Sequence, residues 1–394
     1  MNTQNTPVHV KLWNADFWRL ALANMLMTMA VYMLVPVFPL WLMAHGEASN
    51  IGWGMVSYGV GLFSMGGFCN YLVQRFRRNH VCVVSLLFML ACIALMYAVS
   101  RPGLLPLPAG ISFVVLRFFL GLTFGLAQMV ILSTLVIDVC ESFQRTEANY
   151  GTSWFARFAM SLGPVVSLLL YQFHGIGLVL LVAGICCLVS LLFIQMVSFP
   201  FKAPDDNVST FSLDRFFLPD GCLLFVNLFL ITTIVGLVFS TPLTPLFYAM
   251  LMFGFFLALL AEKYMFADAD LKSETVTGLI LIGAALLIMR HQSLSVHGLT
   301  AISPAIPPVF IGFAIGVIGS RFLLFFIKLS HHCQRGTSQS TFFLAWESGI
   351  SCGLALGYTA LSDCLFESGL AIAVVALLLY NFITHSWYMK HKNR

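Results

Sequence analysis

Long runs of apolar residues alternate with short polar connections along the whole chain. Each run approaches the roughly 20 residues that a helix needs to cross the hydrocarbon core of a bilayer. Because lipid offers the backbone no hydrogen bonds, a spanning segment of this kind must be helical. The pattern predicts an all-α polytopic membrane protein with twelve transmembrane helices, at 17–43, 50–73, 80–100, 109–137, 151–172, 176–197, 222–240, 243–262, 275–290, 306–328, 338–361 and 366–388.

Composition supports this interpretation. Of the 394 residues, 59% are hydrophobic and only 9% are charged, whereas a soluble domain carries roughly a quarter charged residues. The weakest prediction is the run 275–290, whose ends depend on Glu274 and Arg290. Without that run the chain would cross the membrane eleven times and its termini would lie on opposite sides.

Orientation follows from the positions of Lys and Arg, which concentrate in cytoplasmic loops. Arg101 and Arg290 alone fall on the side opposite the N-terminus. Fifteen of the 20 fall on its own side: Lys11, Arg19, Arg75, Arg77, Arg78, Arg145, Lys202, Arg215, Lys263, Lys272, Lys328, Arg335, Lys390, Lys392 and Arg394. We therefore expect both termini to be cytoplasmic. Without long extramembrane domains or organelle signals, the chain is expected in the inner membrane of a bacterium. The net charge of +4 reflects these loops and does not indicate a nucleic-acid partner.

The longest polar connection, 198–221, lies at the middle of the chain with six predicted spans on either side. We expect an N-terminal six-helix bundle at 1–197, this segment as a cytoplasmic loop, and a C-terminal six-helix bundle at 222–394. A shift of 190 residues superimposes several positions: Gln144-Arg145 on Gln334-Arg335, Ser161 on Ser351, Gly163 on Gly353, and Arg157 on Glu347. Such matches favour two parallel repeats related by an axis along the membrane normal.

The fourth span reads Arg117-Phe-Phe-Leu-Gly121-Leu-Thr-Phe-Gly125. With two halves of six helices and internal termini, it resembles the major facilitator superfamily of secondary transporters, whose fourth helix carries R-x-x-x-G-x-x-x-G. The small residues Gly121 and Gly125 are expected at helix contacts. The resemblance covers the whole chain in architecture and short stretches in motif.

The loop after the second span resembles the superfamily's G-x-x-x-D-R-x-G-R motif in part. Arg75 and Arg78 match, whereas Gln74 stands where the family has Asp. The resemblance implies a conformational latch in which Arg78 pairs with Asp138 at the cytoplasmic end of the fourth helix. It does not imply the contact to the eleventh helix that the family's Asp makes.

The fifth span contains Gly163-Pro164 within Ala159-Met-Ser-Leu-Gly-Pro-Val-Val-Ser167. This stretch resembles the G-x-x-x-G-P-x-x-G pattern of the superfamily's antiporters, with Ala and Ser in place of the outer glycines. A proline bends a helix and small residues allow close helix contact. The resemblance points to export rather than uptake.

Ionisable residues inside spans cost roughly 2.5–3.5 kcal/mol at the bilayer centre, and they mark pathways or proton relays by default. Glu347 in the eleventh span is the candidate for proton coupling or substrate contact; a structural ion pair is its alternative. Arg157 in the fifth span is a candidate for binding an anionic substrate or an acid, with a gate as its alternative. Since they occupy equivalent depths in opposite halves, they are expected to line one central cavity.

Two further arginines and the first span complete the candidate pathway. Arg117 has the support of its motif, and packing against carbonyls of a neighbouring helix is its alternative. Arg321 in the tenth span has no motif. The first span has no acid from residue 20 to 43 and offers Asn24 and Tyr32 instead. Either Glu347 therefore couples protons alone, or the chain is not driven by protons.

The favoured function is secondary active transport of a small molecule by alternating access, most simply proton-coupled efflux of an amphipathic compound. Uptake of a sugar, peptide or other nutrient is the first alternative, and a non-transporting receptor or assembly factor is the second. The chain has no phosphate-binding G-x-x-x-x-G-K-[ST] and no H-E-x-x-H motif, so an ATPase or other enzyme is not expected. No cofactor is expected. His331-His332-Cys333 lacks the fourth ligand of a metal site. The expected partners are the substrate, a coupling proton or other ion, and the lipid bilayer around a monomer.

Overall fold

The computed structural model describes residues 11–101, 108–199, 208–265, 271–294, 303–331 and 334–392, and within these ranges every regular element is a helix. Part of the predicted central loop, including Lys202, and His332-Cys333 lie outside the described residues. The first half comprises α1 (Ala15–Ala44), α2 (Asn50–Ser64), α3 (Gly66–Arg75), α4 (Arg78–Ser100), α5 (Ala109–Val130), η1 (Ile131–Leu135), α6 (Val136–Asp138) and α7 (Arg145–Gln195).

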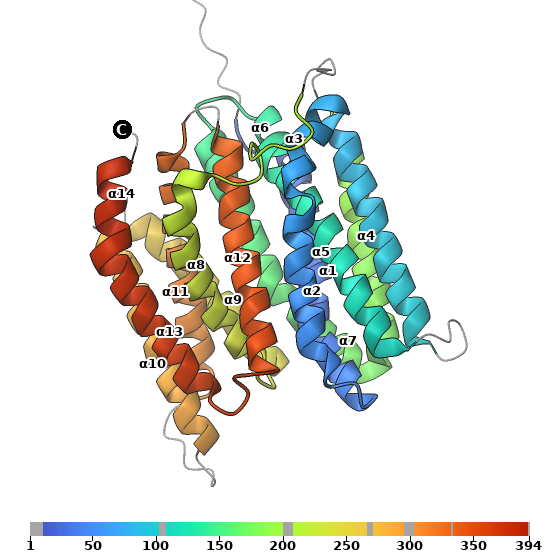
Figure 1. The fold of residues 1–394 in the computed structure, drawn as a ribbon, viewed down its shortest axis with the longest axis vertical. Coiled ribbons are helices and arrows are strands. Elements are labelled where there is room, and N and C mark those ends of the chain that lie inside the picture. Colours follow the sequence, from blue (N-terminus) through green and yellow to red (C-terminus); the bar gives the residue numbers. More distant parts are fainter. Residues whose placement is uncertain are drawn as a thin grey trace, which may run out of the picture.

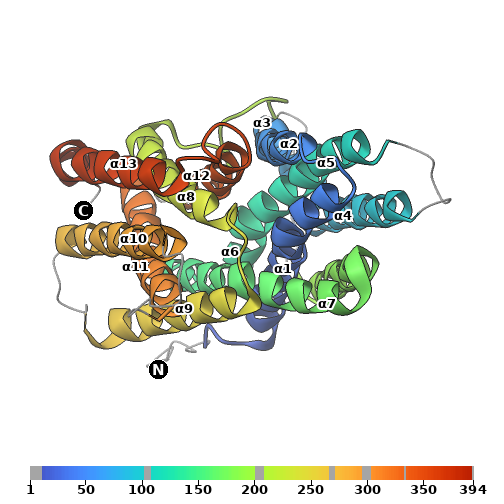
Figure 2. The ribbon, with the colours of Figure 1, turned by 90° about the horizontal axis from the view of Figure 1, so that it is seen from below.

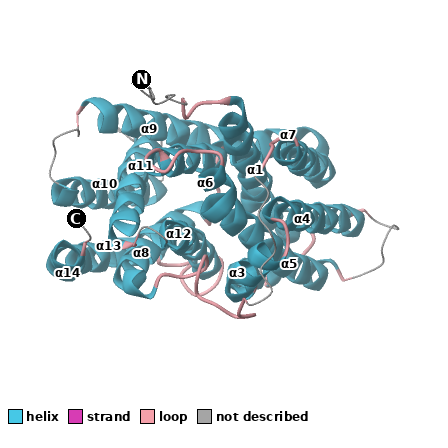
Figure 3. Ribbon diagram, turned by 90° about the horizontal axis from the view of Figure 1, so that it is seen from above, coloured by secondary structure: helices cyan, strands magenta, loops and turns pink. Residues whose placement is uncertain are grey.

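The second half comprises η2 (Pro219–Gly221), α8 (Cys222–Phe239), α9 (Pro245–Tyr264), α10 (Leu271–Leu294), α11 (Ile306–Leu329), α12 (Arg335–Gly357), α13 (Leu365–Leu378), η4 (Leu379–Thr384) and α14 (His385–His391). Figure 1 shows the first half in blue to green and the second in yellow to red, side by side. Figures 2 and 3 view the two halves along the helices.

Twelve membrane crossings can be traced through the described residues. The pairs α2–α3 and α5–α6 each make one crossing, interrupted by Met65 and by the π-helical turn η1 respectively, and α13–α14 makes one across η4. The long α7 makes two, because Gly175 adopts a positive φ of 68° and reverses the chain there. The predicted twelve-helix fold is confirmed. We call the face at which α1 begins the N-face and the other the far face; since twelve is even, α14 ends at the N-face.

By length and composition alone, nine described helices qualify as membrane spans. The difference from twelve has local causes. The two crossings of α7 are counted as one span although the chain reverses at Gly175 between them, α2 and α3 are each too short alone, and α12 is too polar. The predicted run 275–290 proves to be the middle of the longer α10, which includes both Glu274 and Arg290.

Helix packing separates a lipid-facing surface from a buried centre. The outer helices expose large apolar side chains, such as Phe88 on α4 and Val375 on α13. In water so much apolar surface would be a liability, whereas lipid accepts it. Nearly every side chain of α12 is buried, including its polar ones. The helix therefore lies at the core, where it contacts α8 in its own half and α2 across the interface.

Small residues set the closest helix contacts in both halves. A Cβ atom built on Gly163 would lie 2.9 Å from the Met29 carbonyl oxygen of α1, and one on Gly353 would lie 2.0 Å from the Thr233 carbonyl oxygen of α8. The 190-residue shift relates these two glycines, so the same contact is built twice. The repeat therefore extends to packing as well as to sequence.

We expect Gly121→Ala to destabilise the protein by about 1–3 kcal/mol, the usual penalty for overpacking a tight contact. A Cβ at this position would lie 2.2 Å from the Tyr58 carbonyl oxygen, so α5 and α2 would have to separate. The control is Gly283→Ala, whose Cβ would meet Leu370 at an ordinary 3.7 Å. Thermal unfolding in detergent is measured for the two purified variants. Equal melting temperatures would contradict the close contact of α5 with α2 at Gly121.

Candidate functional site

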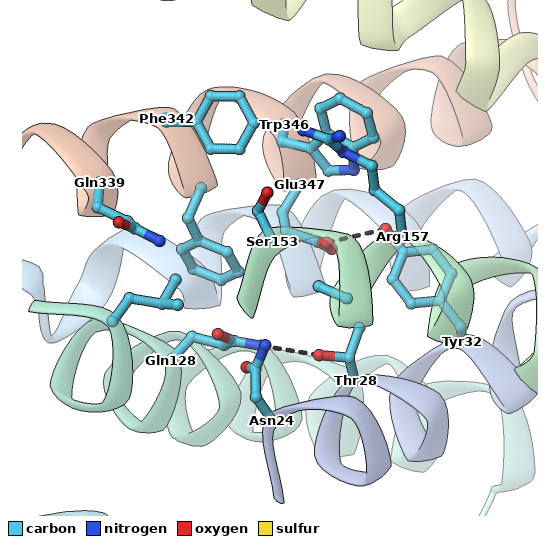
Figure 4. Close-up of a pocket in the computed structure, with 13 residues that line it drawn as sticks. Asn24, Thr28, Tyr32, Gln128, Ser153, Arg157, Gln339, Phe342, Trp346 and Glu347 are labelled. Carbon is cyan, nitrogen blue, oxygen red and sulfur yellow. Dashed lines mark hydrogen bonds between the residues drawn. The ribbon is translucent and has the colours of Figure 1, made fainter. Parts of the chain in front are cut away.

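A narrow cavity lies between the two halves near the middle of the helices (Figure 4). Helices α1, α5, η1 and α7 of the first half and α12 of the second line it. Its volume is only about 40 Å³, room for no more than a few water molecules. The lining residues are Asn24, Thr28, Tyr32, Gln128, Leu132, Ser153, Ala156, Arg157, Gln339, Phe342, Phe343, Trp346 and Glu347. Four of the predicted pathway residues are among them: Asn24, Tyr32, Arg157 and Glu347.

Glu347 joins the second half to two helices of the first. Its carboxylate lies near the middle of α12 and accepts hydrogen bonds from the hydroxyls of Tyr32 on α1, at 2.8 Å, and Tyr58 on α2, at 3.2 Å. The side chain is only 6% exposed, and no described Lys or Arg lies within 4.0 Å of it. An acid held by neutral donors at this depth can exchange a proton once water reaches it.

Arg157 stands on the opposite wall of the cavity. One terminal nitrogen, Nη1, donates to Ser320 Oγ at 2.7 Å and to the Gly316 carbonyl oxygen at 3.2 Å, both on α11. Its guanidinium lies 4.5 Å from the ring centroid of Trp154. The other terminal nitrogen, Nη2, is buried and has no hydrogen-bond partner in the described part of the chain. The arginine therefore keeps one donor for a further acceptor.

Arg117 lies outside this cavity, in a smaller space next to it that Tyr32, Tyr58 and Glu347 also line. It is 1% exposed. Its guanidinium lies between the rings of Phe38 and Tyr58, with centroids at 5.1 and 5.0 Å, in cation–π geometry. Tyr58 thus connects Arg117 on one side of its ring with Glu347 at its hydroxyl.

Some site residues escaped the sequence analysis. Tyr58 binds Glu347, Gln128 donates to Thr28 Oγ1 at 2.8 Å, and Gln339 lines the cavity. Tyr58 and Gln128 are polar residues in apolar runs, which was the available signal, whereas Gln339 lies in the polar stretch 336–341 and gave no such signal. Asn24 Nδ2 donates to the Thr152 carbonyl oxygen at 3.3 Å, which ties α1 to α7 at the wall of the cavity.

The structure does not bring Arg321 to either cavity. Its Nε forms an ion pair with Glu274 of α10, a residue that is itself buried. Glu274, which seemed to mark the end of a predicted span, instead lies inside α10 as the partner of this arginine. In this structure Arg321 therefore joins α11 to α10 and does not line the predicted pathway.

At the N-face, Arg78 at the start of α4 pairs with Asp138 at the end of α6, as the motif implied. Both side chains are 19% exposed. Arg75, the other predicted latch residue, ends α3 and lines a separate groove against α4 and α5. The structure thus brings together one of the two predicted latch arginines with the acid.

The described part of the central loop fastens the two halves together at the N-face; we call residues 208–218 the strap. The Ser212 N–H donates to the Gly67 carbonyl oxygen of α3 at 2.9 Å. On α12, Thr337 Oγ1 accepts from the Arg215 N–H at 2.8 Å and Thr341 Oγ1 accepts from the Leu218 N–H at 2.8 Å. The sequence indicated only a boundary here, whereas the loop forms specific hydrogen bonds.

The halves also meet at the far face, where a Cβ on Gly52 of α2 would lie 2.3 Å from Thr359 Cγ2, just beyond the end of α12. Contacts between the halves at both faces explain why so little space remains in the central cavity. A substrate of any size requires the halves to move apart.

Two membrane-embedded helix bundles around a shared, buried polar cavity are the arrangement of a membrane transporter. The Major Facilitator Superfamily model matches residues 20–386, and the chain belongs to that superfamily.

Solved structures agree in fold. The human organic anion transporter MFSD10 superimposes with a TM-score of 0.68 at 15% identity, covering 93% of this chain and 98% of that one. The POT family transporter PepTSo gives 0.69 at 10% identity, covering 96% and 99%. A bacterial homologue of the iron transporter ferroportin, in an outward-facing state, gives 0.67 at 15% identity, covering 95% and 99%. Among curated proteins, none matches the sequence.

We expect Arg78 and Asp138 to be energetically coupled by about 1 kcal/mol or more, because both are largely withdrawn from water. The double-mutant cycle uses Arg78→Asp, Asp138→Arg and the combined swap, with unfolding free energies as the measurement. The pair Arg290–Glu367 at the far face, 3.0 Å apart with both side chains 46% exposed, is the control and should couple more weakly. Equal coupling energies in the two cycles would contradict the prediction that the N-face ion pair contributes more to stability than an exposed one.

Proposed function

We propose that this transporter exports an amphipathic small molecule in exchange for protons, with the central cavity as the substrate site. The observation that carries the proposal is the contact of Glu347 with Tyr32 and Tyr58, since it places a protonatable group between the two halves. The sequence pattern further favours a monomer in a bacterial inner membrane with both termini cytoplasmic. We place the boundaries of the two bundles at residues 197 and 222, on either side of the central loop.

The coupling mechanism follows from which half supplies each group. Tyr32 and Tyr58 belong to the first half and Glu347 to the second, so rocking of the halves alters both hydrogen bonds. A carboxylate accepts from two hydroxyls more strongly than a neutral acid does. Loss or gain of a proton at Glu347 therefore shifts the balance between conformations, as coupling requires.

The cavity walls favour a substrate with an apolar body and an anionic group. Phe342, Phe343 and Trp346 of α12 offer aromatic surface, while Arg157 keeps Nη2 without a partner. A guanidinium with a free donor is suited to a carboxylate or phosphate. The fold neighbour MFSD10 is named an organic anion transporter, which agrees with this class. The likeness of the segment around Gly163-Pro164 to antiporters supports export.

We expect Glu347→Gln to abolish pH-gradient-driven transport while leaving exchange without a gradient, because glutamine retains hydrogen bonding but cannot exchange a proton. The assay uses proteoliposomes loaded separately with carboxyfluorescein, an anionic amphipath, and ethidium, a cationic one. Glu367→Gln, at an exposed acid on the far face, is the control.

An unchanged pH dependence in Glu347→Gln would exclude the coupling role. Accumulation of the dye on the side opposite to that expected for export would instead favour an uptake permease. Absence of flux for every compound in a wider panel that includes sugars and peptides would favour a non-transporting receptor or assembly factor.

Arg157→Gln tests the substrate class. Loss of a charge-assisted hydrogen bond in a buried site costs about tenfold or more in affinity, so the KM for carboxyfluorescein should rise by about that factor while the KM for ethidium should not rise. Lys328→Gln, at an exposed cation of α11, is the control. Equal changes for the two dyes would contradict a specific role for Arg157 toward anions.

A further inference from the structure

A second cavity, of about 250 Å³, lies at the N-face where both halves and the strap meet. We call it the N-face cavity. Its lining differs from that of the central cavity in carrying four arginines and two aspartates: Arg78, Arg145, Arg215, Arg335, Asp138 and Asp214. None of these residues lines the central cavity, so the two sites are separate.

The charges in the N-face cavity do not balance. Asp138 pairs with Arg78, and Asp214 lies 4.0 Å from Arg215. For the remaining two, Arg145 and Arg335, no acid of the described chain lies within ion-pair distance. The cavity is left with two positive charges. Burial, with the nearby Arg78, also lowers the pKa of the Arg215 guanidinium, as expected where positive charge is incompletely neutralised.

Arg145 and Arg335 occupy equivalent places in the two repeats. Arg145 is the first residue of α7 and Arg335 the first of α12, and the 190-residue shift superimposes them. A cation at a helix N-terminus opposes the helix dipole, whereas an anion there is stabilised. The first turn of α12 has no acidic residue to offset its arginine. The first turn of α7 does contain an acid, Glu147, so the placement of Arg335 is the unfavourable one, and an anion between the two arginines would offset it.

Unused hydrogen-bond donors also border the N-face cavity. Ser133 of η1 is 5% exposed, and its hydroxyl has no partner in the described structure; the same holds for Nε of Arg145. Helix α12 packs closely against η1 at Gly336. A side chain would not fit there, because a Cβ at this position would lie 2.7 Å from the Ser133 carbonyl oxygen. A π-helical turn at such a point is typical of a functional site.

We propose that the N-face cavity binds a phosphate-bearing anion that bridges Arg145 of the first half and Arg335 of the second. Guanidinium groups bind phosphate oxygens with two parallel hydrogen bonds, and the Ser133 hydroxyl adds a third donor. Because the anion contacts both halves, it stabilises the conformation in which the N-face is closed. The phosphate group belongs to a free anion or to a lipid headgroup, and the experiment separates these sources.

The test measures binding to the purified full-length protein in detergent with radiolabelled inorganic pyrophosphate, and thermal stability against sodium chloride of equal ionic strength. A lipid arm compares nanodiscs containing phosphatidic acid with nanodiscs of phosphatidylcholine alone. The variant Arg145→Gln/Arg335→Gln removes two cavity charges. Lys328→Gln/Lys390→Gln, at exposed cations of the same face, removes two charges outside it.

We expect saturable stabilisation by pyrophosphate or by phosphatidic acid, weakened at least about tenfold in the arginine variant and unchanged in the lysine variant. A response to pyrophosphate identifies a free anion, and a response confined to phosphatidic acid identifies a headgroup. No response in either arm, or equal responses in the two double variants, overturns the proposal. If the double arginine variant does not fold, Arg335→Gln alone decides between the same outcomes.

Discussion

The contact between one carboxyl group of the second half and two hydroxyls of the first is the interaction on which the centre of this protein depends. A carboxyl group at this depth in lipid is costly unless it is hydrogen-bonded. Glu347 finds its donors, Tyr32 and Tyr58, on helices of the opposite half. Neither half can therefore satisfy its own polar groups alone. The same requirement explains why α12, the helix that carries Glu347, is rich in polar residues and yet among the most deeply buried.

The two repeats keep a common backbone and differ in charge where they meet. Arg157 and Glu347 are equivalent by the 190-residue shift, yet one is a cation and the other an acid. Arg145 and Arg335 are equivalent and keep the same charge. On the axis between the halves, the first pair gives a cavity of mixed charge in the membrane and the second gives a basic cavity at the N-face. The repeat supplies equivalent positions in the two halves, and differences in residue type at single positions make the two cavities chemically different.

The length of the apolar runs was enough to predict the twelve crossings. Each crossing must be apolar and helical because of its own contact with lipid, whatever the other helices do. The pairing of Arg78 with Asp138 followed from a motif that fixes both positions. Partners across the interface were not predictable in this way. Tyr58 and Glu347 are 289 residues apart, and a polar residue in a span gives no indication of which other helix it faces.

The strap escaped prediction for a related reason. Its backbone N–H groups bond the Gly67 carbonyl oxygen of α3 and two threonine hydroxyls of α12, and Arg215 Nε donates to Asn70 Oδ1 of α3. Bonds of this kind leave no distinctive composition in the sequence. The segment is polar, as a flexible linker would be. Only the positions of Thr337 and Thr341 one turn apart on α12 reveal that the loop follows the helix surface.

Closure of the N-face rests on the strap and η1 rather than directly on the predicted latch. Arg78 and Asp138 both belong to the first half, so their ion pair cannot by itself hold the two halves together. It fixes the start of α4 to the end of α6, and thereby positions η1, against which Gly336 of the second half packs. Near the N-face, hydrogen bonds join the strap to Gly67 of α3 on one side and to Thr337 and Thr341 of α12 on the other, and join Tyr150 of α7 to Glu262 of α9. Opening toward the N-face must break the Tyr150–Glu262 bond, the η1–α12 contact and the strap's bonds to one of the halves, whereas the ion pair can remain intact throughout.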